Sequence, residues 1–169
     1  MAVRYQLIRR PPAAVWKVLE QPSHYADWVV GTHETAPREG RWPELGSSLA
    51  YTVKIGPRRV EGYTVVRRHE PPRRLELEAK SPFGNARIAI DVRDWGGESL
   101  VVVDEHPLRG LSDKLHNVAL DTLIQLRHRG MLSRLARLVE RETPQRPGGD
   151  GLRTGPASVP SRAVEAGRE

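Results

Sequence analysis

The densest group of side chains that could perform acid–base chemistry is the run Asp104-Glu105-His106. Neighbouring residues of a strand point to opposite faces of a sheet, so Glu105 faces one way and the other two face away from it. Glu105 continues the apolar alternation of Val101 and Val103. On an apolar face, burial would raise the pKa of its carboxyl group and suit it to general acid or base catalysis. The alternative is a hydrated sheet edge, where Glu105 pairs with a nearby arginine.

Two further residues could act on a bound molecule. Tyr51 alternates with apolar residues, and its hydroxyl could orient the polar end of a ligand, whereas Tyr63 is expected on the opposite side. His116 interrupts an apolar helical stripe and could reach the same ligand, although a solvent-facing or capping role fits equally well. The catalytic candidates are therefore Glu105, Tyr51 and His116. They do not form a Ser–His–Asp arrangement.

Six histidines raise the question of a metal site. Their spacing matches neither His-x-His nor His-Glu-x-x-His, and the chain has no cysteine that could supply a thiolate. No glycine-rich phosphate loop follows a strand. We therefore expect no metal and no cofactor.

The net charge of +6 arises from 27 basic and 21 acidic residues. The basic residues are spread along the chain, with four separate arginine pairs at predicted strand ends, and do not form one block, so we do not expect nucleic-acid binding. No apolar run approaches the roughly 18–20 residues of a membrane span, and the first residues lack the apolar core of a signal peptide. A cytoplasmic location without stable membrane insertion is the expectation.

Alternating apolar residues predict strands at 3–8, 47–55, 58–69, 73–80, 86–94 and 98–106, with a further short strand possible around 33–35. Short turns rich in proline and glycine separate the last five strands, which should form an antiparallel meander. Between the first strand and the meander, prolines 11 and 12 open one short helix and Ser23 caps a second.

A proline-free stretch at 112–142 predicts a long final helix. One apolar stripe of this helix would face the sheet; it contains Leu115, Ala119, Thr122, Leu123 and Leu126. A second stripe could pack under the short helices or the strand at 3–9, with Gly130 marking a bend or a close approach, or could form a homodimer surface; it contains Leu120, Ile124, Met131, Leu135 and Leu138. Residues 143–169 are rich in proline, glycine and arginine, and we expect a disordered tail.

This order of elements resembles the START-like or polyketide cyclase-dehydrase (SRPBCC) superfamily. Three segments carry the resemblance: Ile8 to Leu19 (IRRPPAAVWKVL), Tyr25 to Trp28 (YADW) and Glu70 to Leu75 (EPPRRL). The resemblance covers about 1–142. It implies an α+β helix-grip domain, in which a curved antiparallel sheet of about six or seven strands wraps around a long C-terminal helix, with two short helices after the first strand.

The resemblance also implies a cavity between the sheet and the last helix that holds a small hydrophobic molecule such as a lipid, polyketide or aromatic metabolite. Two alternatives stay open: a cofactor-independent polyketide cyclase/aromatase or dehydrase, and a protein-interaction module. Trp28 could form a lid or pack in the core, and Trp42 and Trp95 could mark a contact surface or stabilise turns. The expected ligand-binding residues are Trp28, Leu49, Tyr51, Val53, Leu75, Leu77, Ile88, Ile90, Val103, Leu115, Ala119, Thr122 and Leu126.

Overall fold

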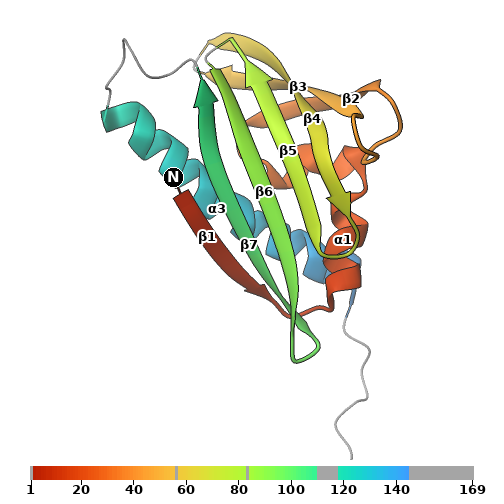
Figure 1. Ribbon diagram of the computed structural model, residues 1–169. Coiled ribbons are helices and arrows are strands. Elements are labelled where there is room, and N and C mark those ends of the chain that lie inside the picture. Colours follow the sequence, from red (N-terminus) through yellow and green to blue (C-terminus); the bar gives the residue numbers. More distant parts are fainter. Residues whose placement is uncertain (1, 56, 83, 110–117, 145–169) are drawn as a thin grey trace, which may run out of the picture.

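The computed structural model describes residues 2–55, 57–82, 84–109 and 118–144. Seven strands form one antiparallel sheet in the order β1-β7-β6-β5-β4-β3-β2. The sheet is curved, and α3 runs diagonally behind it (Figure 1). The fold is therefore the α+β helix-grip expected from the sequence. The elements are β1 (Ala2–Ile8), α1 (Pro12–Leu19), η1 (Pro22–His24), α2 (Tyr25–Trp28), β2 (Thr32–Glu39), β3 (Ser48–Ile55), β4 (Arg58–Glu70), β5 (Arg74–Ser81), β6 (Gly84–Trp95), β7 (Glu98–Arg109) and α3 (Val118–Glu142).

The first short helix, α1, begins as its two prolines predict. Pro11 is the extended N-cap residue and Pro12 opens the helix, where a missing backbone N–H costs no hydrogen bond. The helix buries Val15, Trp16 and Leu19 against the sheet and α3. Trp16 is thus a core residue, and its ring stacks on the ring of His69 at 5.8 Å between centroids.

The strands present two chemically different faces. On the inner face, Leu75 pairs with Ile90 and Ile90 pairs with Val103, so one apolar row crosses three strands. On the outer face the corresponding row holds Arg74 and Asp91. The period-two alternation of the sequence therefore fixes which face covers the core.

One strand is longer than its pattern predicts. The sequence favours only a short strand around 33–35, whereas β2 extends over Thr32–Glu39. The strand lies at the edge of the sheet and most of its side chains are exposed. Because neither face is fully buried, its residues show no alternation, and two register irregularities interrupt its pairing with β3.

The second half of α3 belongs to the core. Met131, Leu135 and Leu138 are buried, so this part of the second stripe packs inside the domain and does not form a dimer surface. A Cβ atom at Gly130 would lie 3.2 Å from Cγ2 of Val30, which confirms the close approach expected at this glycine. The predicted helix start at Ser112 lies outside the described residues.

The helices were also compared with the requirements for a membrane span. Across the described chain, no helix combines the length and the apolar character needed to cross a lipid bilayer.

Candidate functional site

The inner face of the sheet is buried unevenly. At one end, α1, α2 and the second half of α3 cover it, and Leu49, Leu75, Leu77, Ile90 and Val103 are 0–3% exposed. At the other end lie the hairpins that join β3 to β4 and β5 to β6 (Figure 1). There the inner side chains are only partly buried. We call this end the open corner; its residues are Tyr51, Val53, Gly62, Ala79, Ala86, Ile88 and Glu105.

Small side chains form the floor of the open corner. Ala79 of β5 pairs with Ala86 of β6, and Gly62 lies one strand away on β4. Larger side chains stand on both sides of them, with Tyr51 on β3 and Ile88 on β6. Gly62 lies diagonally to Ala79, whose partner on β4 is Thr64. Three small residues on neighbouring strands fill less of the space above the sheet than larger residues would. Gly62 and Ala86 were not predicted as site residues, although strand alternation was sufficient to place both on the inner face.

Tyr51 lies flat on the sheet. Its register partner on β4 is Gly62, and its hydroxyl donates a hydrogen bond of 3.3 Å to the backbone carbonyl of Lys80 on β5. The ring therefore spans from β3 to β5. Tyr63 points to the outer face, where the guanidinium carbon of Arg38 lies 4.0 Å from the centroid of its ring. The opposite orientations of the two tyrosines agree with the alternation.

Glu105 occupies the inner face on β7. It pairs with Ile88 of β6 and with Ala2 of β1, so it lies at the border of the open corner. Arg4 is its diagonal neighbour on the same face, because Arg4 pairs with Val103. Nε of Arg4 is buried and has no hydrogen-bond acceptor. One partly buried carboxylate and one guanidinium thus stand beside an otherwise apolar surface.

The predicted acid–base residues do not come together. Tyr51 lies on β3 and Glu105 on β7, and three strands separate them. The path from β3 to β7 crosses four inter-strand spacings of about 4.8 Å, so the two residues are roughly 19 Å apart along the sheet. The third candidate, His116, lies outside the described residues.

Apart from Trp28, the predicted ligand-binding residues fall into four groups. Val53, Tyr51 and Ile88 belong to the open corner, whereas Leu49, Leu75, Leu77, Ile90 and Val103 are packed in the core beneath it. Leu115 lies outside the described residues. The structure describes the backbone of α3 at Ala119, Thr122 and Leu126 but not their side chains.

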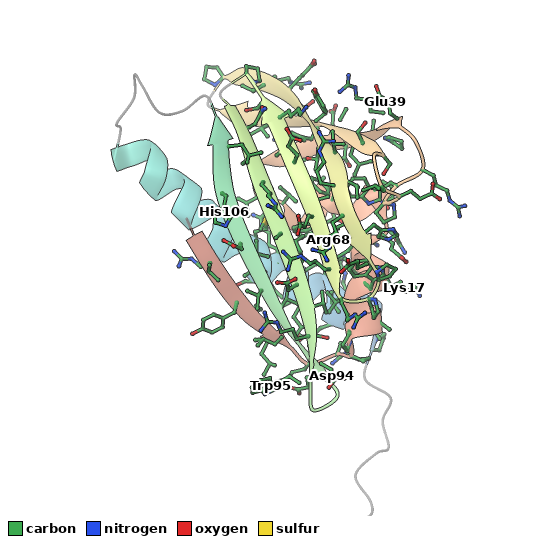
Figure 2. The ribbon with its side chains drawn as sticks, in the orientation of Figure 1. Lys17, Glu39, Arg68, Asp94, Trp95 and His106 are labelled. Carbon is green, nitrogen blue, oxygen red and sulfur yellow. The ribbon has the colours of Figure 1, made fainter. Side chains whose placement is uncertain are left out.

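The three other predicted contact residues are tryptophans in different environments. Trp28 is buried in the core with its ring edge-on to Tyr25, so it does not form an exposed lid. Trp42 packs against the same tyrosine and donates a hydrogen bond to the carbonyl of Leu19. Trp95 is 63% exposed at the β6–β7 turn (Figure 2). Trp42 and Trp95 therefore do not form the shared surface that an interaction module would present.

A buried polar contact lies next to the open corner. The hydroxyls of Tyr25 on α2 and Thr64 on β4 are 3.2 Å apart, and Thr64 pairs with both Leu49 and Ala79. This contact joins α2 to the centre of the sheet, because a buried hydroxyl requires a hydrogen-bond partner. It was not predicted, since nothing in the sequence relates two residues 39 positions apart.

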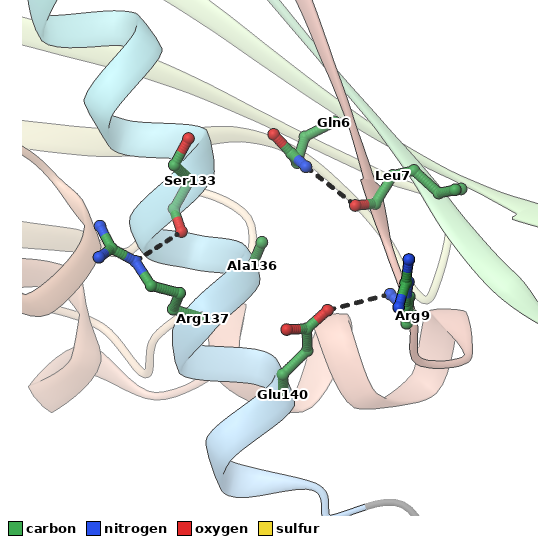
Figure 3. A pocket seen from close by; sticks show the side chains of 7 residues that line it. All are labelled: Gln6, Leu7, Arg9, Ser133, Ala136, Arg137 and Glu140. Atoms are coloured by element: carbon green, nitrogen blue, oxygen red, sulfur yellow. Dashed lines mark hydrogen bonds between the residues drawn. The ribbon is translucent and has the colours of Figure 1, made fainter.

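The described residues also line two hollows, and the second of them shares Tyr51 and Gly62 with the open corner. One is a groove of about 480 Å³ between β1 and α3, where the backbone N–H of Arg9 donates a bond of 3.4 Å to Oε1 of Glu140 (Figure 3). The other, of about 650 Å³, lies across β2, β3 and β4; Glu34, Arg38 and Glu61 are among its lining residues. Both carry charges of both signs, which favour water over an apolar ligand.

The outer face carries an ion-pair network around Glu76, which is 4% exposed. Arg74 and Arg87 both donate hydrogen bonds to its carboxylate. Burial by itself would raise the pKa of Glu76, but these hydrogen bonds and positive charges outweigh burial and lower it.

A second polar pair lies nearby on the same face. Nε2 of His106, which Figure 2 labels, lies 2.8 Å from Oδ2 of Asp104. Within the described residues, no three His, Asp or Glu side chains come together as metal ligands.

Solved structures share this architecture. The Zhui aromatase/cyclase from Streptomyces sp. R1128 is 15% identical, with a TM-score of 0.69 over 83% of this chain and 93% of its own. Ara h 8.0201 is 10% identical, with a TM-score of 0.67 over 83% and 97%. TTHA0849 from Thermus thermophilus is 14% identical, with a TM-score of 0.65 over 84% and 98%. At these identities the similarity shows the fold alone.

The family of this chain is shown by a family model and not by a single related sequence. No curated protein sequence matches the chain. The family model described as "Polyketide cyclase / dehydrase and lipid transport", however, matches residues 3–140, which include nearly the whole sheet and most of α3. The chain therefore belongs to the polyketide cyclase/dehydrase and lipid-transport family of the SRPBCC superfamily.

Proposed function

We propose that the protein binds a small hydrophobic molecule, such as a lipid, polyketide or aromatic metabolite, between the open corner and the first half of α3. One observation carries the proposal: apolar inner side chains stay partly exposed above a floor of small residues at one end of a sheet whose other end is fully buried. Apolar surface gains about 25 cal/mol per Å² when it is removed from water, and a hydrophobic ligand would supply the cover. The family to which the chain belongs supports this class of ligand.

The polar groups beside the open corner suggest how a ligand would be oriented. The hydroxyl of Tyr51 already donates to a backbone carbonyl. Glu105 and Arg4 stand at the β7 and β1 side of the same face. We therefore expect the polar end of the ligand to lie toward β7 and its apolar part to lie over Ala79 and Ala86.

Filling the floor tests this proposal. Ala79→Leu adds three carbons above the floor and should weaken ligand binding by about tenfold or more, because the added side chain occupies space that the ligand needs. Binding would be measured by displacement of a polarity-sensitive fluorescent probe with fatty acids, flavonoids and aromatic polyketides. Wild-type protein should show saturable displacement by at least one class.

The matched control is Ala50→Leu. Ala50 is a partly buried alanine on β3, but it points to the outer face, where it pairs with Tyr63. Affinity should stay within about twofold of the wild-type value, because surface substitutions have small effects. Absence of saturable binding across the panel, or equal weakening by both substitutions, would contradict the proposal.

A catalytic role in polyketide cyclisation is the second candidate, and Glu105 favours it. This carboxylate is partly buried on the inner face, where a general acid or base would reach a bound substrate. Because three strands separate it from Tyr51, such chemistry would rest on Glu105 without that partner. Turnover of a linear poly-β-ketone that is lost in Glu105→Gln, while binding is retained, would distinguish an enzyme from a carrier.

A further inference from the structure

We propose that Tyr51 is the end wall of the ligand space, and that Gly62 is a positioning residue that determines how much space Tyr51 leaves. Together they would set the length of apolar chain that the open corner accepts. This inference rests on the proposed function, because it concerns the same space. It assigns to Tyr51 a steric role in place of the polar role expected from the sequence.

The evidence is the close contact between Tyr51 and β4. A Cβ atom added at Gly62 would lie 2.6 Å from both Cζ and the hydroxyl oxygen of Tyr51. It would also lie 2.6 Å from the backbone oxygen of Lys80, the acceptor of the Tyr51 hydrogen bond. Side-chain carbons do not approach other atoms this closely, so the flat position of the ring requires glycine at 62.

The requirement is one of space and not of backbone conformation. Gly62 does not have a positive φ, and it sits in the regular β3–β4 register between Glu61 and Tyr63. A glycine inside a strand weakens the strand and often marks a place where another group approaches closely. Here the approaching group is the ring of Tyr51.

A side chain at 62 would press on both the ring and the Lys80 carbonyl, and the ring is the part that can move farther. The Lys80 oxygen belongs to the backbone of β5, which is paired on both sides, whereas the Tyr51 ring is the end of a side chain with two rotatable bonds. The ring would rotate away from the sheet into the open corner. Gly62→Ala should therefore shorten the ligand space, and Tyr51→Ala should lengthen it.

The length of the ligand space can be measured without knowledge of the natural ligand, by attaching alkyl chains to a single thiol at position 79. The chain has no cysteine, so Ala79→Cys provides one unique thiol beside the Tyr51 hydroxyl. Its thiolate displaces methanesulfinate from alkyl methanethiosulfonates and forms a mixed disulfide with the alkylthio group. A homologous series of reagents then places alkyl chains of increasing length in the open corner. The readout is the unfolding temperature of each adduct, with mass spectrometry to verify complete modification.

Each methylene group that fits into the space should raise the folding equilibrium constant of the adduct about fourfold, until the space is full. The chain length of greatest stability should increase by several carbons in Tyr51→Ala, about the length of the removed ring, and should decrease in Gly62→Ala. Tyr51→Phe should keep the optimum, because the ring remains. The matched control, Tyr63→Ala, removes an outer-face tyrosine next to Gly62 and should also keep it.

The outcomes separate this inference from the proposed function. An optimum that is the same in Tyr51→Ala and Tyr63→Ala overturns the inference, and this comparison does not depend on whether Gly62→Ala folds. A thiol that reacts only after unfolding shows that the open corner is inaccessible and overturns both proposals. A shifted optimum together with no binding of free lipids, flavonoids or polyketides supports the inference and rejects the proposed class of ligand.

Discussion

At the scale of single residues, the arginines of the outer face are held by carboxylates. Arg68 lies 3.7 Å and Arg74 2.8 Å from Oε1 of Glu76, and Arg67 donates a bond of 2.7 Å to Glu78. Burial would raise the pKa of Glu78, but the hydrogen bond and charge of Arg67 outweigh burial and lower it. The guanidinium groups of these three arginines are therefore occupied by carboxylates of the same sheet.

Glu76 should contribute stability that depends on pH. Its pKa is lower in the folded chain than in the unfolded chain, so the contribution is fully present above the unfolded value of about 4.3 and is lost as the pH falls through the folded value. Glu76→Gln should lower the free energy of unfolding by about 2–3 kcal/mol at pH 7, since it leaves a cluster of arginines without its buried partner. Urea unfolding at several pH values should show the difference from wild type shrinking below about pH 4.

The control for this substitution is Glu61→Gln. Glu61 is exposed on the outer face and forms no ion pair within the described part of the chain. Its substitution should change the free energy of unfolding by less than about 0.5 kcal/mol. A pH-independent loss of stability in Glu76→Gln would mean that side-chain shape, and not charge, holds the network.

At the scale of elements, the C-terminal end of α3 is tied to the first strand. Arg10, just after β1, donates one hydrogen bond to the carbonyl of Thr143 and another of 3.3 Å to the carbonyl of Glu140. Its own carbonyl accepts a bond of 2.6 Å from Ser99 on β7. The last carbonyls of a helix lack partners within the helix and carry partial negative charge, so a guanidinium there satisfies both needs.

The Arg10 guanidinium caps the C-terminal end of α3, and removing it should loosen that end of the helix. Arg10→Ala should lower the free energy of unfolding by about 1–2 kcal/mol, because two carbonyls lose a charged donor. Arg9→Ala is the matched control, since Arg9 is exposed and contacts Glu140 through its backbone N–H, which the substitution keeps. Hydrogen exchange should increase at 139–143 in Arg10→Ala only. Equal effects of both substitutions would show that general charge at this end, and not the cap, is responsible.

At the scale of the whole molecule, burial is concentrated at one end of the sheet. The core cluster joins residues from Ile8 to Val139, and α1, α2 and the second half of α3 all contribute to it. The open corner lies at the other end of the sheet. The molecule therefore has one fully packed end and one less packed end, and a ligand held at the less packed end, as proposed, would not require the core to open.

This distribution predicts the effect of truncation. Since every described residue of the core cluster precedes 140, we expect removal of 145–169 to change the free energy of unfolding by less than about 0.5 kcal/mol. Removing 138–169 takes away Leu138 and Val139, both fully packed, and should prevent folding. Circular dichroism during thermal unfolding would compare the two chains. Marked destabilisation by the shorter truncation would show that the last residues contribute to the fold.

The sequence by itself determined the elements and their faces. Alternation in β3 to β7 is strong because one face is buried, and proline and glycine mark the turns, so the meander, the two tyrosine orientations and the inner position of Glu105 were all predictable. The edge strand β2 was underestimated because it lacks a buried face. The burial of Met131, Leu135 and Leu138 was one of two predicted possibilities, and only packing chose between them.

Only the tertiary structure decided how the site is built. It separated Tyr51 from Glu105 by three strands, paired the hydroxyls of Tyr25 and Thr64 and brought Gly62 under an aromatic ring. These relations depend on sheet order and on distances between residues far apart in the chain. Periodicity reports which face a side chain occupies, but it carries no information about which residues meet across that face.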